Sequence, residues 1–494
     1  MKPSMTLITA ALLLLGLASA TQAALFTWTG TGSGQLWSTA TNWSGGVAPV
    51  VSTTTDDIAI NGAHTSQVNQ AWTIKSLHGG NGFTLNGADL TLNSTITCDY
   101  DGTINNNLIL GTGAGLITHG YGSTFMIKGN VTSTNIGLDI RGGKPTSISG
   151  VVSLGTAGTF ITNTGTKLIL SNAANSYSGD NVIAAGTLST NSIANAGTAC
   201  TIGSGSKIIM AEPGAQGTLQ FTGTNGGSSN RTFTLLSTGT GDTGTIENTV
   251  AGKTLTLSGN FQYDGTSRSA GAWKFTGDGN GLVSGNITTT GASLTKEGTG
   301  TWTLTGSNNS YGGGTTVSTG TLLVSNTLGS GTGTGSVTVA SGAKLGGTGI
   351  IDPGTGNTVT INGILAPGES GVGTLTVGSL GSLNNATLTG TYLADIGDLV
   401  KVYGQLALGG SSILTLGGSP TPGTNYMLAS YTTGGLTGTF ATINNLPGGW
   451  QVTYGSDAIT LGLIPEPASL LLLAAGGLLV MTRARRRQQQ AEVV

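Results

Sequence analysis

The chain has 494 residues, of which 87 are Gly and only 8% are charged, with 18 Lys and Arg against 20 Asp and Glu. Ordinary soluble domains carry about 25% charged residues, and low charge with a mean hydropathy of +0.15 excludes intrinsic disorder. The net charge of −2 gives no electrostatic attraction to nucleic acid. Because Gly, Thr and Ser dominate and helix-forming residues are scarce, the composition predicts a β-rich chain with many tight turns.

Residues 1–24 have the features of a secretory signal peptide. Lys2 provides the positive charge, Leu7–Leu17 the apolar core, and Ala18-Ser19-Ala20 or Thr21-Gln22-Ala23 a small-residue cleavage site. We therefore expect the chain to pass through the Sec translocon and to leave the cytoplasm.

Residues 25–100 are rich in tryptophan and are expected to form an N-terminal β cap with the first turns of the fold. Exposed aromatic rings stack on sugar faces, so Trp28, Trp37 and Trp43 are candidate glycan contacts. In the alternative, which we favour, these large rings cover the open apolar end of the first turn.

Two segments further along the chain are repeats of each other. Leu168–Leu188 (LILSNAANSYSGDNVIAAGTL) aligns without a gap with Trp302–Leu322 (WTLTGSNNSYGGGTTVSTGTL). Alternation of apolar and small polar residues in each segment predicts strands with one buried face, and Gly and Asn allow the positive φ of tight corners. Among the identical residues, Asn175, Ser176, Tyr177, Gly179, Gly186, Thr187 and Leu188 recur as Asn309, Ser310, Tyr311, Gly313, Gly320, Thr321 and Leu322.

A single strand–turn–strand unit cannot bury its own apolar face, so such units must stack to form a shared core. The sequence therefore predicts an all-β fold in which residues 101–386 form a right-handed parallel β-helix, a solenoid. With about 20 residues a turn, the exported part of the chain forms about 22 turns. An array of short antiparallel sandwiches is the alternative architecture.

Residues 387–463 lose this regularity and contain Pro420, Pro422 and Pro447. We expect them to form a C-terminal β region that closes the solenoid.

The chain has two cysteines, Cys98 and Cys200. In an exported chain a disulfide between them would close a long loop. Two separately buried thiols are favoured, because a single bridge is no framework for so long a chain.

Residues 464–494 combine three features in order. Pro465-Glu466-Pro467 precedes an apolar run, Ala468–Met481, and four arginines follow it: Arg483, Arg485, Arg486 and Arg487. Arginines that follow a membrane helix stay on the cytoplasmic side, which places the rest of the chain outside that membrane. The run is shorter than the roughly 20 residues of a full span, so we expect a transient membrane segment, with an uncleaved tail anchor as the alternative.

Residues that carry catalysis are scarce. His64, His78 and His119 are the only histidines, and no spacing typical of zinc ligands occurs. Polysaccharide-cleaving β-helices need paired carboxylates, or carboxylate-bound Ca²⁺ beside a basic residue. The candidate pairs are Asp56 with Asp57, Asp99 with Asp101 and Asp395 with Asp398.

Each candidate pair has a simpler structural interpretation. Asp99 and Asp101 share one face if the segment is extended, but Asp101-Gly102 is also a turn signal, which we favour. Asp395 and Asp398 flank Ile396-Gly397, as in a solvated loop. The exported part has three scattered arginines, Arg141, Arg231 and Arg268. The sequence therefore predicts no catalytic residue, no cofactor and no metal site.

Leu294–Asn326 (LTKEGTGTWTLTGSNNSYGGGTTVSTGTLLVSN) resembles the autotransporter-associated β-strand repeat, also called the passenger-associated transport repeat. Leu168–Leu188 is a degenerate match, and Trp28–Asn61 is similar to the usual start of such proteins. The resemblance implies a passenger-like solenoid at the cell envelope surface, or in the extracellular matrix, of a Gram-negative-type bacterium.

The tail, from Pro465-Glu466-Pro467 to Arg487, resembles a PEP-CTERM sorting signal. This resemblance implies that an exosortase-like enzyme of the envelope recognises the segment and cleaves near the Pro-Glu-Pro, so the chain would be held in the membrane only before processing.

The expected function is structural or adhesive and without catalysis, with extracellular polysaccharide or neighbouring copies of the chain as partners. The alternative is a β-helix that binds or degrades polysaccharide as a lyase or glycosidase. Ice binding by threonine arrays is a third possibility, which we consider weaker because the threonine spacing in the sequence is irregular.

Overall fold

The structure is a computed structural model that describes residues 24–51, 55–237, 239, 241–265, 270–368 and 371–464. In these residues the regular elements are short strands and two 3₁₀ helices, η1 (Ala40–Asn42) and η2 (Ser44–Gly46). Nearly all strand pairs are parallel and connect one turn of the chain with the next. The chain is therefore a parallel β-solenoid, as the repeats predict, and the sandwich alternative is wrong.

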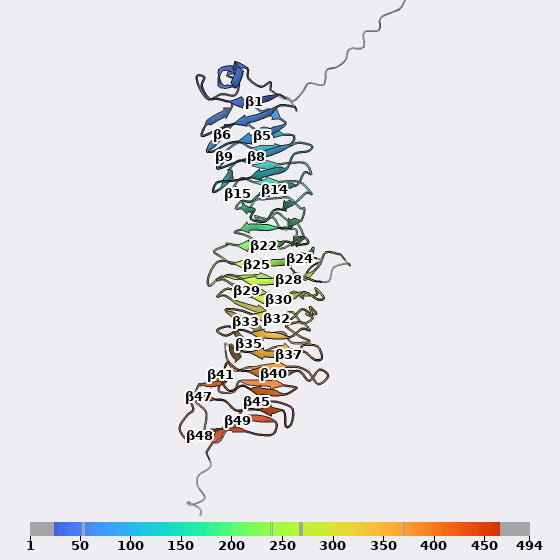
Figure 1. Ribbon diagram of the computed structural model, residues 1–494, viewed down its shortest axis with the longest axis vertical. Helices are drawn as coiled ribbons and strands as arrows, with labels where there is room; N and C mark the ends of the chain where they lie inside the picture. Colours follow the sequence, from blue (N-terminus) through green and yellow to red (C-terminus); the bar gives the residue numbers. More distant parts are fainter. Residues whose placement is uncertain are drawn as a thin grey trace, which may run out of the picture. The chain divides into compact units, whose positions relative to one another are not determined.

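The chain divides into two compact units, Met1–Ala157 and Gly158–Val494. Figure 1 shows how successive strands stack on one another within each unit. The domain boundaries expected from the sequence remain predictions.

In the first unit, β1 belongs to one sheet, and each turn from β2 onward contributes one strand to each of three sheets. Sheet 1 contains β1 (Leu25–Trp28), β2 (Asp57–Ile60), β5 (Ser76–Gly79), β8 (Thr95–Cys98), β11 (Leu116–His119) and β14 (Leu138–Gly142). Sheet 2 contains β3 (Thr65–Val68), β6 (Phe83–Gly87), β9 (Gly102–Ile104), β12 (Phe125–Ile127) and β15 (Pro145–Ile148). Sheet 3 contains β4 (Trp72–Ile74), β7 (Leu90–Leu92), β10 (Leu108–Leu110), β13 (Val131–Thr132) and β16 (Val152–Ser153).

The second unit begins with two parallel sheets. Sheet 4 contains β17 (Thr159–Ile161), β19 (Asn181–Ile183), β21 (Lys207–Met210), β24 (Thr232–Leu235) and β27 (Phe261–Tyr263). Sheet 5 contains β18 (Lys167–Leu170), β20 (Gly186–Thr190), β22 (Gln216–Phe221), β25 (Thr243–Asn248), β28 (Ala272–Thr276), β30 (Ser293–Lys296), β32 (Thr315–Val317), β34 (Val337–Val339), β37 (Thr358–Ile361), β40 (Asn385–Leu388), β43 (Leu406–Leu408) and β46 (Leu436–Thr437).

Two further sheets complete the second unit. Sheet 6 contains β23 (Gly227–Ser229), β26 (Thr254–Leu257), β29 (Asn280–Val283), β31 (Thr301–Leu304), β33 (Thr321–Val324), β35 (Lys344–Gly347), β38 (Ile364–Pro367), β41 (Thr391–Asp395), β44 (Ile413–Gly417) and β47 (Thr442–Asn444). Sheet 7 contains β36 (Ile350–Ile351), β39 (Thr374–Val377), β42 (Leu399–Val402), β45 (Tyr426–Ser430), β49 (Ala458–Leu463) and β48 (Trp450–Tyr454).

The turns differ in length, which corrects the expected number of turns. Thr65 pairs with Thr84 on the next turn, whereas Gly186 pairs with Gly217. Because many turns carry loops longer than the assumed repeat, the chain makes about 16 turns instead of about 22.

The core is a stack of inward-facing side chains. Alternate residues of most strands are buried, as in β30 and β31, which follows from the period of two in the sequence. In-register pairing places like residues over each other, and Phe233 stacks on Phe261 with ring centroids 4.6 Å apart and planes 9° from parallel. Such columns bury apolar surface continuously from turn to turn.

Asparagines and glycines shape several corners of the solenoid. The backbone N–H of Asn286 donates to Asn260 Oδ1 on the preceding turn at 3.0 Å, and the N–H of Asn308 donates to Asn286 Oδ1 at 3.0 Å. Beside this ladder, a Cβ atom at Gly285 would lie 1.9 Å from the carbonyl oxygen of Gly259. These corners therefore combine an amide that bridges two turns with a glycine that lets their backbones approach closely.

The C-terminal end of the second unit departs from parallel pairing. β45 and β48 both pair with β49 in antiparallel fashion, and the side chain of Trp450 is buried there. A small antiparallel module thus ends sheet 7.

Cys98 and Cys200 are both free and buried. Cys98 Sγ lies 2.7 Å from the carbonyl oxygen of Tyr100, and burial raises the pKa of its thiol to about 12. The prediction of two separately buried thiols is confirmed.

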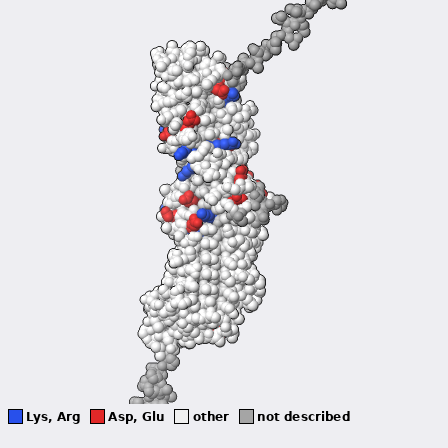
Figure 2. Space-filling view, viewed as in Figure 1, with Lys and Arg blue, Asp and Glu red and all other residues white. Residues whose placement is uncertain are grey.

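The surface carries few charges. Figure 2 shows one face on which Lys, Arg, Asp and Glu side chains are scattered singly or in small groups, while the later turns of the second unit show none. Uncharged residues therefore form most of this face.

Candidate functional site

The tryptophans proposed as glycan contacts are buried in the first unit. Trp28, Trp37 and Trp43 are each no more than 2% exposed. Their rings meet edge to face, with centroids 5.1 Å apart for Trp28 and Trp43 and 5.5 Å apart for Trp37 and Trp43. Trp37 also meets Trp72 on β4 at 5.3 Å, and Trp37 Nε1 donates to Ser66 Oγ at 3.2 Å. Buried rings offer no face to a sugar, so their placement agrees with the cap interpretation.

The first two candidate carboxylate pairs lie in structural contacts. Asp57 is paired with Lys75 Nζ at 3.1 Å and accepts a hydrogen bond from Ser76 Oγ, and the side chain of Asp56 is buried. Asp101 Oδ1 accepts a hydrogen bond from the N–H of Thr124 on the next turn at 2.9 Å. Asp101 therefore holds a corner, in agreement with the turn interpretation.

Asp395 and Asp398 line a cavity of about 310 Å³ in the second unit, with Lys344 among the other lining residues. The buried carboxylate of Asp398 accepts hydrogen bonds from the N–H groups of Gly373 at 2.8 Å and Asp395 at 2.9 Å, one on each oxygen. Burial raises the pKa of Asp398 above its usual value. Because both oxygens are bonded to backbone, Asp398 holds the β41–β42 connection to the neighbouring turn.

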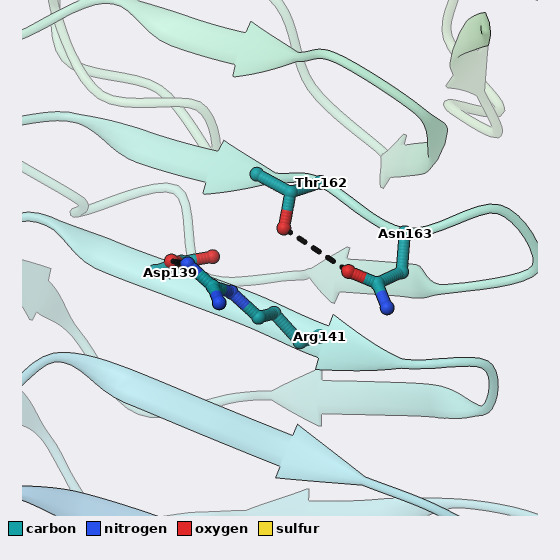
Figure 3. A network of polar contacts seen from close by, with 4 residues as sticks. All are labelled: Asp139, Arg141, Thr162 and Asn163. Atoms are coloured by element: carbon teal, nitrogen blue, oxygen red, sulfur yellow. Dashed lines mark hydrogen bonds and ion pairs between the residues drawn. The ribbon is translucent and has the colours of Figure 1, made fainter.

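The described arginines are also held in local contacts. Arg141 folds back along β14 onto Asp139 (Figure 3), with Nη2 2.6 Å from Asp139 Oδ2, and this hydrogen bond raises the pKa of Arg141. Arg231 is buried and donates to backbone carbonyls, including that of Ala194 at 3.0 Å. Arg268 lies outside the described residues. In the described part of the chain, no group of three or more His, Cys, Asp and Glu residues could hold a metal ion.

Each repeat found in the sequence folds as one turn whose first and last strands stack on each other. Leu168 on β18 pairs with Leu188 on β20, and Trp302 on β31 pairs with Leu322 on β33. Between these two strands lie a loop and one further strand, which is β19 in the first repeat and β32 in the second. The two repeats therefore share one structure as well as one sequence pattern.

The tyrosine of each repeat is completely buried and its hydroxyl is bonded four residues ahead. Tyr177 Oη donates to Asn181 Oδ1 at 2.7 Å, and Tyr311 Oη lies 2.7 Å from Thr315 Oγ1. Burial raises the pKa of both phenols. The ring atoms Cγ and Cδ2 of Tyr311 approach Gly333 so closely that a Cβ there would lie 2.9 Å from each. The tyrosine ring thus packs against a glycine of the following turn.

The asparagine of each repeat joins its turn to the next one. Asn175 Nδ2 donates to the carbonyl oxygen of Thr201 at 2.6 Å, and Asn309 Nδ2 donates to that of Gly331 at 2.8 Å. Asn309 Oδ1 also accepts from the N–H of Ile287 on the preceding turn at 2.8 Å. A buried amide that satisfies backbone groups on both sides fixes the spacing and register of three consecutive turns.

Lys296 is a buried cation in the second repeat region. Its Nζ donates to the carbonyl oxygens of Glu297 at 2.6 Å, Gly298 at 2.9 Å and Thr319 at 3.2 Å, the last on the following turn. Burial lowers the pKa of Lys296 to about 8, with the nearby Glu297 acting in the opposite direction. Sequence reasoning did not single out Lys296, although its position inside an apolar-alternating strand is a signal for it.

These features define a parallel β-solenoid whose turns are locked by buried polar side chains. Residues 162–189 and 294–324 match the passenger-associated-transport-repeat family. The chain therefore carries two passenger-associated-transport-repeats, which confirms the resemblance seen at Leu294–Asn326. No curated protein matches the chain.

The predicted sorting signal, from Pro465-Glu466-Pro467 to Arg487, lies outside the described residues, and so do residues 1–23 of the predicted signal peptide. In the part of the chain that the structure describes, no helix is both long and apolar enough to cross a membrane.

Two tyrosines that sequence reasoning missed lie exposed on the first unit. Tyr100 and Tyr121 are 46% and 64% exposed, with ring centroids 5.6 Å apart. The signal that could have found them is their separation of about one turn in the sequence, the same as that of Cys98 and His119, which pair in sheet 1.

We predict that Asn309→Ala destabilises the second unit by about 2–3 kcal/mol, because it leaves buried backbone groups on adjacent turns without partners. The neighbouring Asn308 is exposed and provides the matched control, since Asn308→Ala should change stability by less than about 0.5 kcal/mol. Urea unfolding of both variants measures the difference. Equal stability of the two variants would contradict the role of Asn309 in holding adjacent turns together.

We predict that the free energy of unfolding contributed by Lys296 increases between pH 7.5 and 9.5. The folded chain releases this proton near pH 8, whereas an unfolded lysine holds it to about pH 10.4, so the unfolded state binds more protons in this range. The stability of the wild type relative to Lys296→Met should therefore increase by about 1–2 kcal/mol.

Urea unfolding at both pH values, with the exposed Lys253→Met as control, measures this change. Cys98 holds its proton to about pH 12 in the folded chain, so its contribution to the free energy of unfolding decreases as the pH increases. The effect of Lys296 is therefore obtained by comparing the wild type with Lys296→Met at each pH. A Lys296→Met variant with the same pH dependence as the wild type would refute the assignment.

Proposed function

We propose that this chain is an exported, non-enzymatic structural and adhesive protein of the cell surface or extracellular matrix. The passenger-associated-transport-repeats and the β-solenoid fold fit an exported passenger-like protein. We further propose that the chain is adhesive, that it has no catalytic activity, and that it is sorted through its C-terminal segment.

One column of outward-facing side chains on sheet 5 is the observation that carries the proposal. In-register pairing stacks one residue from each strand of the sheet, and nine of the twelve are threonines. None of them is buried. The column consists of Lys167, Thr187, Thr218, Thr245, Lys274, Thr295, Thr316, Thr338, Thr360, Thr387, Ala407 and Thr437.

A column of hydroxyls suits weak contacts that repeat along a surface. Each hydroxyl both donates and accepts a hydrogen bond, and strands in a sheet repeat about every 4.8 Å. Polar side chains that are neighbours in the chain can also bond each other, as Thr162 after β17 does to Asn163 Oδ1 at 3.2 Å (Figure 3). Many weak contacts in a row can hold a polysaccharide or another copy of the chain without one strong pocket.

The threonine column also bears on ice binding. We considered ice binding weaker because the threonine spacing is irregular in the sequence. In the folded chain, however, these threonines form a regular column, so irregular spacing no longer argues against ice binding. On β22, β25 and β28 the next outward positions beside the column are Gln220, Glu247 and Thr276, so the flank there is mixed. This mixed flank favours the adhesive function.

The proposed route of sorting rests on the tail. Pro465-Glu466-Pro467 and the arginines from Arg483 to Arg487 resemble the signal that an exosortase-like enzyme recognises. In this proposal the chain passes through the Sec translocon, is held by Ala468–Met481 in the membrane, and is then cleaved near the Pro-Glu-Pro.

The alternative is cleavage of polysaccharide, and its best candidate site is the cavity that Asp395 and Asp398 line with Lys344. The purified protein should release no oligosaccharides from a panel of neutral and acidic polysaccharides, with and without added Ca²⁺. Depolymerisation that is lost in Asp395→Asn and kept in the control Asp352→Asn would replace the structural proposal with an enzymatic one.

We predict that Glu466→Ala, or deletion of Arg483 to Arg487, leaves uncleaved precursor in the membrane fraction, because each change removes part of the recognised signal. Mass spectrometry of the C-terminus together with cell fractionation measures the outcome. Glu492→Ala, beyond the signal, is the matched control and should be processed normally. Normal processing of the signal variants would refute this route of sorting.

A further inference from the structure

Two exposed tyrosines occupy equivalent places on consecutive turns of the first unit. Cys98 on β8 pairs with His119 on β11, and Tyr100 and Tyr121 each lie two residues after that pair. The ring centroids are 5.6 Å apart and the ring planes are inclined by 32°. The backbone holds the two corners together, since the N–H of Tyr121 donates to the carbonyl oxygen of Asp99 at 2.6 Å.

Folding alone does not account for this exposed aromatic surface. Burying an aromatic ring contributes roughly 1.5–3 kcal/mol to folding, and the ring cluster of Trp28, Trp37 and Trp43 in the same unit is buried. Tyr100 and Tyr121 are the strongly exposed aromatic side chains among the described residues of the first unit. Exposed rings held side by side on a rigid corner indicate an interaction site.

Polar residues neighbour Tyr100 in the chain. Asp99 directly precedes Tyr100 and pairs with His78 on the preceding turn, with 3.3 Å between Asp99 Oδ2 and His78 Nε2. The two side chains are 47% and 42% exposed, so both remain open to solvent. Asp101, on the other side of Tyr100, bonds to the N–H of Thr124 at 2.9 Å and keeps the corner in place.

We propose that Tyr100 and Tyr121 form a binding site for a neutral polysaccharide chain, with Asp99 and His78 as its polar contacts. A pyranose ring has an apolar face, which packs on an aromatic ring, and a rim of hydroxyl groups. An exposed carboxylate accepts hydrogen bonds from such hydroxyls, and charge-assisted bonds are the stronger ones. Two rings on consecutive turns suit two sugar units of one chain.

Local charge decides which class of polysaccharide fits. Asp99 and Asp101 flank Tyr100, and their negative charges repel a polymer of uronic acids. A neutral glucan has no such repulsion and retains the stacking surface. This inference deepens the proposed adhesive function and rests on it, because the site meets polysaccharide only if the chain is exported.

Affinity electrophoresis of the purified full protein tests the site. The gels contain hydroxyethylcellulose as the neutral probe, alginate as the acidic probe, or no polymer. We expect hydroxyethylcellulose to retard the wild type and alginate to have little effect. Tyr100→Ala with Tyr121→Ala should weaken retardation at least fivefold, whereas the double Phe variant, which keeps both rings, should retain it.

Ile109→Ala, which removes an exposed apolar side chain from sheet 3, is the control and should bind as the wild type does. Thermal unfolding verifies that all variants fold. Three results would overturn the proposal: no retardation of the wild type by hydroxyethylcellulose, undiminished retardation of the double Ala variant, or stronger retardation by alginate. Fractionation of cells tests export separately, so a failed site and a failed function are distinguishable.

Discussion

The whole structure depends on the parallel, in-register pairing of each turn with the next. This pairing places a residue over its counterpart one turn away, so apolar side chains stack on apolar ones, as Phe233 does on Phe261 with 4.6 Å between ring centroids. No turn buries its own inward face, because the neighbouring turns cover it. Apolar burial, worth about 25 cal/mol per Å², therefore accumulates turn by turn within each unit.

Buried polar groups make this stacking specific. A slip of one residue in a strand would turn its inward side chains outward, and Asn309 and Lys296 oppose such a slip because their backbone partners lie on adjacent turns. A buried polar group without a partner costs about 1–3 kcal/mol, which penalises any other register. The passenger-associated-transport-repeat thus encodes a turn that is locked to its neighbours, and its buried Asn and Tyr are structural residues. The groups proposed to contact partners lie on the surface instead, and they are the exposed hydroxyls of sheet 5 and the two exposed tyrosines.

The sequence by itself determined the local features and the fold class. Alternation with a period of two predicted strands, and the two aligned segments predicted stacking, because neither can bury its face alone. The burial of Cys98 and Cys200 also followed from composition. Trp37 and Trp43 were recognised as large rings near the first turn, for which a cap and a sugar platform were both considered, and their burial in the structure agrees with the cap. These inferences concern residues near one another in the chain, where the pattern and the structure share the same spacing.

Only the tertiary structure decided which residues meet across turns. Loops of different lengths separate the strands, so the sequence distance from Thr187 to Thr218 differs from that between Thr295 and Thr316, yet all four stand in one column. For the same reason the number of turns was overestimated. The pair of Tyr100 and Tyr121 was missed because only the stacking of their turns brings the two rings together. A loop changes the spacing along the chain without changing the register of the sheet, because hydrogen bonding between strands, and not the length of the connection, sets that register.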